Sequence, residues 1–194
     1  MAVLNLCLHL LPRRFWRIGL AVLFIFGEGG PIRAQNTPAQ EYQLKAVFLF
    51  NFIQFVDWPA EAFPQAQSPL IIGVLGDNPF NSYLEETVQG ENMNGHPVVV
   101  RHYHHADEIG PCHILFISQS EDRRLTHVLA DLKGRSILTV GDMEAFTQRG
   151  GMIRFITQNN KIHLQINVDA AKAAKLTISS KLLAPAQIIT SQDS

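Results

Sequence analysis

The sequence has little cysteine, no excess of charge of one sign and no apolar run long enough to span a membrane. Its 194 residues include two cysteines, 16 basic residues and 17 acidic residues. Two cysteines exclude a disulfide-rich scaffold, and the balanced charge argues against a nucleic-acid-binding protein. The apolar stretch near the N-terminus, residues 18–26, is nine residues long, which is too short to cross a bilayer.

Signatures of catalysis are also missing. The glycines of GVLG, residues 73–76, lack the GxGxxG spacing and the lysine of a phosphate-binding loop. No serine lies in a GxSxG motif, and no histidine or aspartate has the context of a catalytic triad. The sequence therefore predicts neither an enzyme nor a cofactor.

The first 34 residues have the layout of a secretory signal peptide. Arginines at positions 13, 14 and 17 precede the apolar stretch, and small residues follow it as far as Ala34. We expect cleavage after Ala34, which would leave residues 35–194 as a single α/β domain. An uncleaved N-terminal anchor is the alternative.

Residues 41–58 contain no helix breaker and predict one helix that is apolar nearly all round. Such a helix must be covered on most of its sides, while a sheet covers only one of them. One interpretation is that all of its apolar side chains enter the core. The other is that an additional face meets a partner protein or a second copy of the chain, with four candidate residues: Val47, Leu49, Phe50 and Ile53.

Strands and helices alternate after this helix. The apolar patterns predict strands at 70–75, 97–103, 113–118 and 136–140, helices at 79–89 and 121–133, and a hairpin from 152–157 and 161–167. A mostly helical tail follows at 169–186. We therefore predict an α/β fold with a mixed, mainly parallel sheet of about six strands, helices on both faces and a C-terminal β-hairpin.

Polar residues follow three of the predicted strands, where ligands collect in open α/β sheets. Asp77, Ser118 and Asp142 lie at these strand ends, and Arg154 lies on the first strand of the hairpin. Together they could line a ligand crevice. For Asp142 the favoured role is instead a helix cap, which is the more common role of an aspartate after a strand. Arg154 could instead be one half of a buried ion pair.

A group of possible metal ligands occupies residues 102–113. His102, His104, Cys112 and His113 are side chains that soft and borderline metals prefer. Their spacing matches no structural zinc pattern, and the segment could equally be a solvated strand edge and loop. We therefore predict no metal site.

Five stretches resemble the YfiR family of exported proteins: residues 42–59, 70–80, 112–118, 137–155 and 166–183. The resemblance covers nearly all of the expected mature chain. It implies a periplasmic regulator without catalysis that binds the sensor part of an inner-membrane diguanylate cyclase, represses it and so controls cyclic di-GMP and biofilm formation. A homodimer is compatible with this role. The alternative function is a periplasmic sensor that binds a small molecule.

The cysteines depart from the family pattern. Cys112 matches one family cysteine, but Gly73 stands where its partner would be, and residues 146–154 contain no cysteine. Cys7 would leave with the signal peptide. The disulfide-based redox response that the resemblance implies is therefore not expected here.

Overall fold

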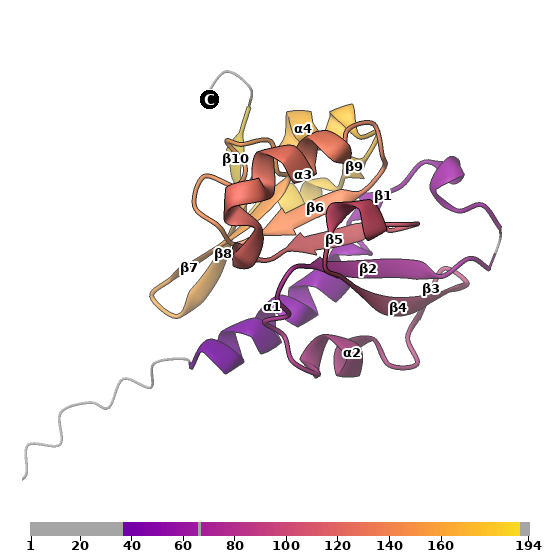
Figure 1. Cartoon of the computed structure of the whole chain (residues 1–194), viewed down its shortest axis with the longest axis horizontal. Helices are drawn as coiled ribbons and strands as arrows, with labels where there is room; N and C mark the ends of the chain where they lie inside the picture. Colours follow the sequence, from indigo (N-terminus) through magenta and orange to yellow (C-terminus); the bar gives the residue numbers. More distant parts are fainter. Residues whose placement is uncertain (1–36, 66, 191–194) are drawn as a thin grey trace, which may run out of the picture. The chain divides into compact units, whose positions relative to one another are not determined.

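A mixed, eight-stranded sheet organises the part of the chain that the structure, a computed structural model, describes: residues 37–65 and 67–190 (Figure 1). The predicted signal peptide lies outside these residues. The strand order is β10-β8-β7-β6-β5-β2-β4-β3. The strands are β2 (Leu70–Leu75), β3 (Asn92–Met93), β4 (His96–Tyr103), β5 (Ile114–Ile117), β6 (Leu138–Gly141), β7 (Ile153–Gln158), β8 (Lys161–Asn167) and β10 (Gln187–Ile189).

The pairing confirms the predicted fold class. Strands β4, β2, β5, β6 and β7 run parallel to one another, β8 pairs with β7 antiparallel, and β10 pairs with β8 parallel. The sheet has two more strands than predicted, β3 and β10, one at each edge. They are two and three residues long, too short to show a period of two in the sequence.

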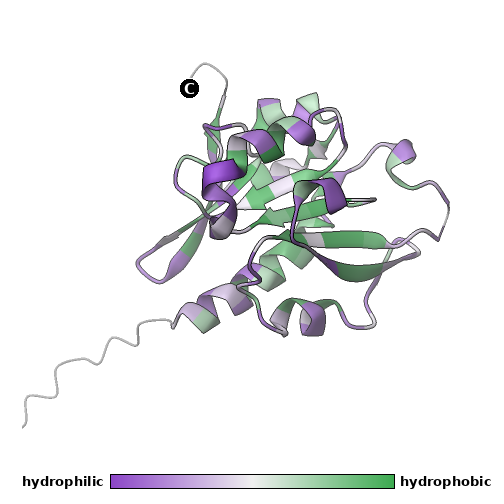
Figure 2. Cartoon of the chain, viewed as in Figure 1, coloured by the Kyte–Doolittle hydropathy of each residue, from purple (hydrophilic) through white to green (hydrophobic). Residues whose placement is uncertain are grey.

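Alternating side chains of the strands divide the core between the two faces of the sheet. In β2, Leu70, Ile72 and Val74 belong to one cluster, whereas Ile71 and Leu75 belong to the other. Figure 2 shows hydrophobic residues along these central strands and hydrophilic residues at the tip of the β7–β8 hairpin. A strand that is buried on both faces has a continuous run of apolar residues in its sequence. For this reason the run LIIGVL predicted β2 correctly.

Helices cover both faces, as predicted. The larger cluster takes in side chains of four helices: α1 (Pro38–Phe52), α2 (Tyr83–Val88), α4 (Val168–Ala173) and α5 (Ser180–Leu183). The opposite face is covered by α3 (Leu125–Asp131), which continues the 3-10 helix η3 (Gln119–Arg124), and by the turn that follows β6. Shorter 3-10 turns are η1 (Ala60–Ala62) and η2 (Ala106–Glu108).

Helix α1 ends six residues before the predicted boundary at Trp58. It begins at Pro38 with a capping box, in which Thr37 and Gln40 exchange side-chain-to-backbone hydrogen bonds. After the helix, strand β1 (Val56–Asp57) pairs with β9 (Thr177–Ile178) in a separate two-stranded sheet. This pairing joins segments about 120 residues apart, so no local pattern could reveal it.

The connection from β6 to β7 is short and closely packed. The ring of Phe146 lies over Gly141 and Gly151, where an added Cβ would be 2.7 and 2.2 Å from ring carbons. Gly150 has φ +102°, which strains other residues. The β6–β7 ladder contains two residue pairs, Val140 with Ile153 and Gly141 with Arg154. The first half of β6 therefore has no strand beside it on this side.

Candidate functional site

A buried ion pair joins α1 to the carboxyl end of β6. The Lys45 ammonium lies 2.6 Å from Asp142 Oδ2, and the two side chains are 3% and 4% exposed. The hydroxyl of Tyr42, one turn earlier on α1, donates to the same oxygen at 2.8 Å. Burial and the Asp142 carboxylate raise the pKa of Tyr42 far above its ordinary value. The Tyr42 hydroxyl therefore stays protonated and available as a donor.

Glu41 extends this group of polar residues towards the β7–β8 hairpin. Its carboxylate lies 2.6 Å from Lys45 Nζ and accepts the Thr157 hydroxyl at 2.8 Å. Lys45 thus lies between two carboxylates, Glu41 on its own helix and Asp142 on the sheet. The arrangement fixes the orientation of α1 on the strand ends.

Asp142 is therefore an ion-pair partner, and Oδ2 of its carboxylate accepts hydrogen bonds from two side chains of α1, Tyr42 and Lys45. The favoured prediction of a helix cap is wrong. Its other oxygen, Oδ1, is buried and has no hydrogen-bond partner among the described residues. The sequence held one signal for this pair: a lysine at position 45 within a phenylalanine-rich helix. A buried lysine needs a compensating charge.

Arg154 lies beside this group but does not join it by an ion pair. It is in register with Gly141, the residue before Asp142, and its Nε is buried without a hydrogen-bond partner within the described residues. The salt bridges of the described residues do not include Arg154. The ion pair predicted as the other role of Arg154 is therefore not found within the described residues.

The other two predicted crevice residues belong to the neighbouring strand ends. Ser118 is buried, and Asp77 is exposed and donates its backbone N–H to Ser120 Oγ at 2.9 Å. A side chain at Gly76 would meet the same hydroxyl oxygen at 2.3 Å. The loops after β2 and β5 are thus joined directly to each other.

A shallow hollow of about 200 Å³ lies further along this edge of the sheet. It is lined by Gln119, Asp122, Asp142, Met143 and Glu144. It takes in Asp142 but not Asp77, Ser118 or Arg154, so the four residues do not share it. A ligand crevice at this edge stays a prediction.

The histidines considered as metal ligands have other partners. His102 Nε2 lies 2.6 Å from a Glu85 carboxylate oxygen, and His104 is exposed. Burial raises the pKa of the Cys112 thiol to about 12, which keeps it from the thiolate form that metals bind. The described residues contain no group of three or more acidic, histidine or cysteine side chains placed to hold a metal ion.

His113 is buried and uses both ring nitrogens. Nδ1 accepts the Ile71 N–H at 3.1 Å, so Nε2 carries the proton and donates to the Ala62 carbonyl, also at 3.1 Å. Phe63 stacks between the rings of His113 and His96, with centroid distances of 4.5 and 4.2 Å. Burial lowers the pKa of His113. This neutral ring holds the segment after β1 against the amino ends of the strands.

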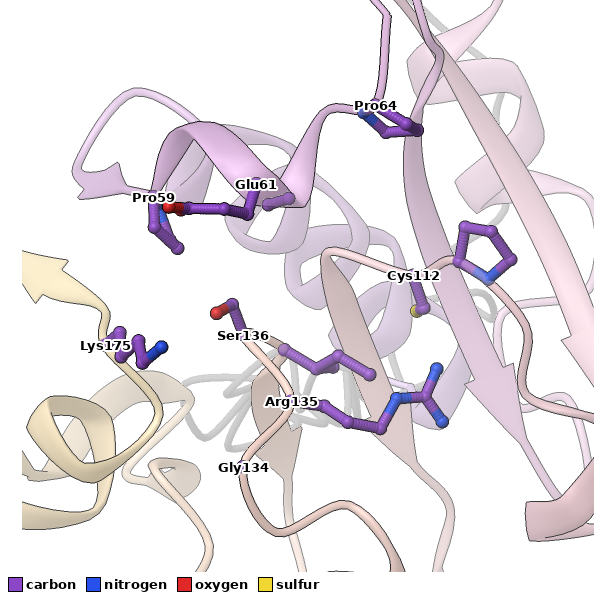
Figure 3. A pocket seen from close by; sticks show the side chains of 11 residues that line it. Pro59, Glu61, Pro64, Cys112, Gly134, Arg135, Ser136 and Lys175 are labelled. Atoms are coloured by element: carbon purple, nitrogen blue, oxygen red, sulfur yellow. The ribbon is translucent and has the colours of Figure 1, made fainter.

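A second hollow, of about 370 Å³, lies near these amino ends (Figure 3). Arg135 and Ser136 line it from the segment before β6, Cys112 from the segment before β5, and Glu61 and Lys175 from the segments that carry η1 and precede β9. The guanidinium of Arg135 donates to the Gly110 carbonyl, so this cation is already engaged.

The predicted partner surface on α1 divides into two parts. Leu49 is 0% exposed and Ile53 6%, so both are core residues with no surface to offer. Val47 is 43% exposed, and Phe50 is partly buried against the core. Leu44, which the prediction omitted, is 42% exposed one turn before Val47. The outward apolar surface of α1 is thus centred on Leu44 and Val47.

None of the helices in the described residues is long and apolar enough to span a membrane.

Comparisons with known proteins identify the family. A search of curated proteins found no match. A family model described as YfiR/HmsC-like matches residues 42–187, which begins within α1 and ends in β10. This family is known for periplasmic regulators of diguanylate cyclases. The chain belongs to the YfiR/HmsC-like family.

Proposed function

We propose that this chain is an exported, non-enzymatic regulator that binds the periplasmic part of an inner-membrane diguanylate cyclase and represses it. The observation that carries the proposal is the family match over residues 42–187, because this family is regulatory rather than catalytic. Through such binding the chain would lower cyclic di-GMP and oppose biofilm formation.

The outward surface of α1 is the best candidate for the contact. Leu44 and Val47 lie one turn apart, and both are more than two-fifths exposed. Positions three apart on a helix are neighbours on its surface. Complete burial of a fully exposed large aliphatic side chain contributes about 1.5–3 kcal/mol. Leu44 and Val47 have about two-fifths of their surface left to bury, so each would contribute roughly two-fifths of that free energy to a complex.

The ion pair beneath α1 supports the same assignment. Lys45 and Asp142 fix the rotation of the helix about its axis, so that Leu44 and Val47 face away from the sheet. A surface that is held in its binding orientation loses less conformational entropy on association than a mobile one.

The test co-expresses the chain with the inner-membrane diguanylate cyclase encoded nearest to it. Capture of the cyclase from solubilised membranes and cellular cyclic di-GMP are both measured. We expect Leu44→Glu combined with Val47→Glu to reduce capture more than about tenfold, because two buried apolar contacts become desolvated charges. Cyclic di-GMP should rise accordingly.

Gln54→Glu, at an exposed position just after α1, is the matched control for an added negative charge. It should leave capture and cyclic di-GMP unchanged. If the double variant is folded and still captures the cyclase, the α1 surface is not the contact. If the unaltered chain neither captures the cyclase nor changes cyclic di-GMP, the proposed function is wrong.

A further inference from the structure

The largest hollow described in the molecule is a cleft of about 560 Å³ between α3 and α4. It exists because β7 pairs with β6 over only two residues, so no strand lies beside the first half of β6. Thr139 of β6 forms part of the lining, and its hydroxyl oxygen accepts the Met152 N–H at 3.1 Å. This volume is typical of small-molecule sites, which commonly measure about 300–1,000 Å³.

The side chains of the cleft are mainly apolar and, on the α4 side, small. Leu129 of α3 faces Ala170, Ala173 and Ala174 of the α4 segment, and Ile137 belongs to the lining near the start of β6. Alanine side chains leave the space open that larger side chains would fill. A methyl added at Gly150, which also lines the cleft, would lie 4.0 Å from Leu129 Cδ1, at ordinary contact distance. This part of the lining therefore has room for a small side chain, although the positive φ of Gly150 disfavours one.

The charged residues that line the cleft are both basic. Lys133 and Arg149 belong to its lining, and none of the described lining residues is acidic. Arg149 is paired with Asp122 at 2.6 Å. Lys133 is exposed and takes part in none of the salt bridges of the described residues. Among the described residues that line the cleft, Lys133 is thus the cation without a salt bridge.

We infer that the cleft binds a small amphipathic organic anion, with an apolar body between α3 and α4 and an acidic head at Lys133. The apolar lining favours a hydrocarbon chain or ring, and Lys133, which forms no salt bridge with the described residues, selects the negative head group. The Thr139 hydroxyl, whose oxygen already accepts a backbone N–H, keeps its proton as a donor on the floor of the site. This site is separate from the α1 surface and goes beyond the proposed function.

Decanoate is a suitable probe, with decylammonium as its counterpart of opposite charge. Binding to the purified protein is measured by calorimetry and by amide chemical shifts of α3 and α4. We expect decanoate to bind and to shift amides of both helices, and decylammonium to bind at least about tenfold more weakly, because Lys133 then repels the head group.

Two variants with matched controls locate the site. Ala173→Phe should fill the cleft and abolish decanoate binding, whereas Ala184→Phe, at an exposed position outside the lining, should not. Lys133→Glu should weaken binding about tenfold because attraction becomes repulsion. Lys172→Glu places the same change on exposed α4 surface outside the lining and should have little effect.

Three outcomes would overturn the inference. The first is that decanoate does not bind the unaltered protein; if Ala173→Phe then also turns a dimer into a monomer in sedimentation, the cleft is assigned to a second copy of the chain. The second is that Ala173→Phe, still folded by circular dichroism, binds decanoate as before. The third is that decylammonium binds as well as decanoate.

Discussion

Two buried polar centres lie at opposite ends of the parallel strands, and they differ in charge. At the carboxyl end, Asp142 holds α1 through the charged Lys45 ammonium. At the amino end, His113 holds the segment around Ala62 through a neutral imidazole. Each centre fastens one segment to the sheet, but the two respond to different perturbations.

The difference follows from what each centre loses when it is disturbed. An ion pair that loses one partner leaves an uncompensated charge in the interior, which strongly destabilises the fold. A neutral histidine that gains a proton places an N–H where it previously accepted one. The charged centre is therefore sensitive to substitution, and the neutral centre is sensitive to pH.

Lys45→Met tests the charged centre and should have the largest effect. It leaves the Asp142 carboxylate buried with one donor, Tyr42, and without a cation. We expect a loss of about 3–5 kcal/mol in the free energy of unfolding, measured by urea denaturation.

A second substitution distinguishes lost charge pairing from lost packing. Lys45→Met combined with Asp142→Leu removes both charges, and an apolar replacement of a whole buried pair is often close to neutral. The double variant should therefore recover most of the lost stability. A double variant as unstable as the single one would show that the pair itself matters little and that shape at these positions decides.

Lowering the pH tests the neutral centre and should have a moderate effect. Burial lowers the pKa of folded His113 below the ordinary value of about 6.5. Between these two values the unfolded chain binds more protons than the folded one, so stability rises with pH. His113 should thus contribute fully above about pH 6.5 and progressively less as the pH falls below it.

The free energy of unfolding is measured for the unaltered protein and for His113→Gln, and the difference between the two is followed from about pH 7.5 to about pH 5. This range includes the ordinary histidine pKa of about 6.5. This difference should shrink as the pH falls. His127→Gln, at a side chain that is 82% exposed, is the control and should show a flatter difference. A His113→Gln difference that stays constant with pH would show that the ring is not kept neutral by burial.

The sequence could reveal those parts of the fold that depend on local patterns of apolar and turn-forming residues. The central strands were predictable because LIIGVL and similar runs are buried on both faces. The hairpin was predictable because Asn159 and Asn160 adopt positive φ readily at its turn. The edge strand β3 pairs locally with β4 but is only two residues long. The edge strand β10 and the end of α1 depend on pairing between segments farther apart, such as Val56 with Ile178. Local patterns carry no information about such pairs.

The candidate site was predictable only in part, for the same reason. The position of Asp142 at a strand end was correct, but its partner Lys45 lies 97 residues earlier. The sequence identified α1 as apolar on too many sides to be covered by the sheet alone. It could not tell Leu49, which is fully buried, from Val47, which is exposed, because apolar residues occur all round the helix.

Cys112 lies at the same end of the sheet as His113 and should give the smallest effect. It is the free cysteine of the described residues, it is buried, and its sulfur donates weakly to the Ile114 carbonyl. Cys112→Ser keeps a donor of similar size, so we expect less than about 1 kcal/mol of change in stability. Reductant should leave the melting temperature of the unaltered protein unchanged.

Gly73→Cys gives the positive control for the reductant experiment. A Cβ at position 73 would lie 3.0 Å from the Cys112 sulfur, and a normal disulfide places each Cβ about 3 Å from the opposite sulfur. The Tyr103 ring, 2.8 Å from that Cβ, and the Leu115 methyl, 2.9 Å from it, would both have to move slightly. The Gly73→Cys protein should therefore form a disulfide, seen as the loss of both free thiols, and only this variant should melt at a lower temperature in reductant. A fall of several degrees for the unaltered protein would instead reveal a Cys112 disulfide between two copies of the chain.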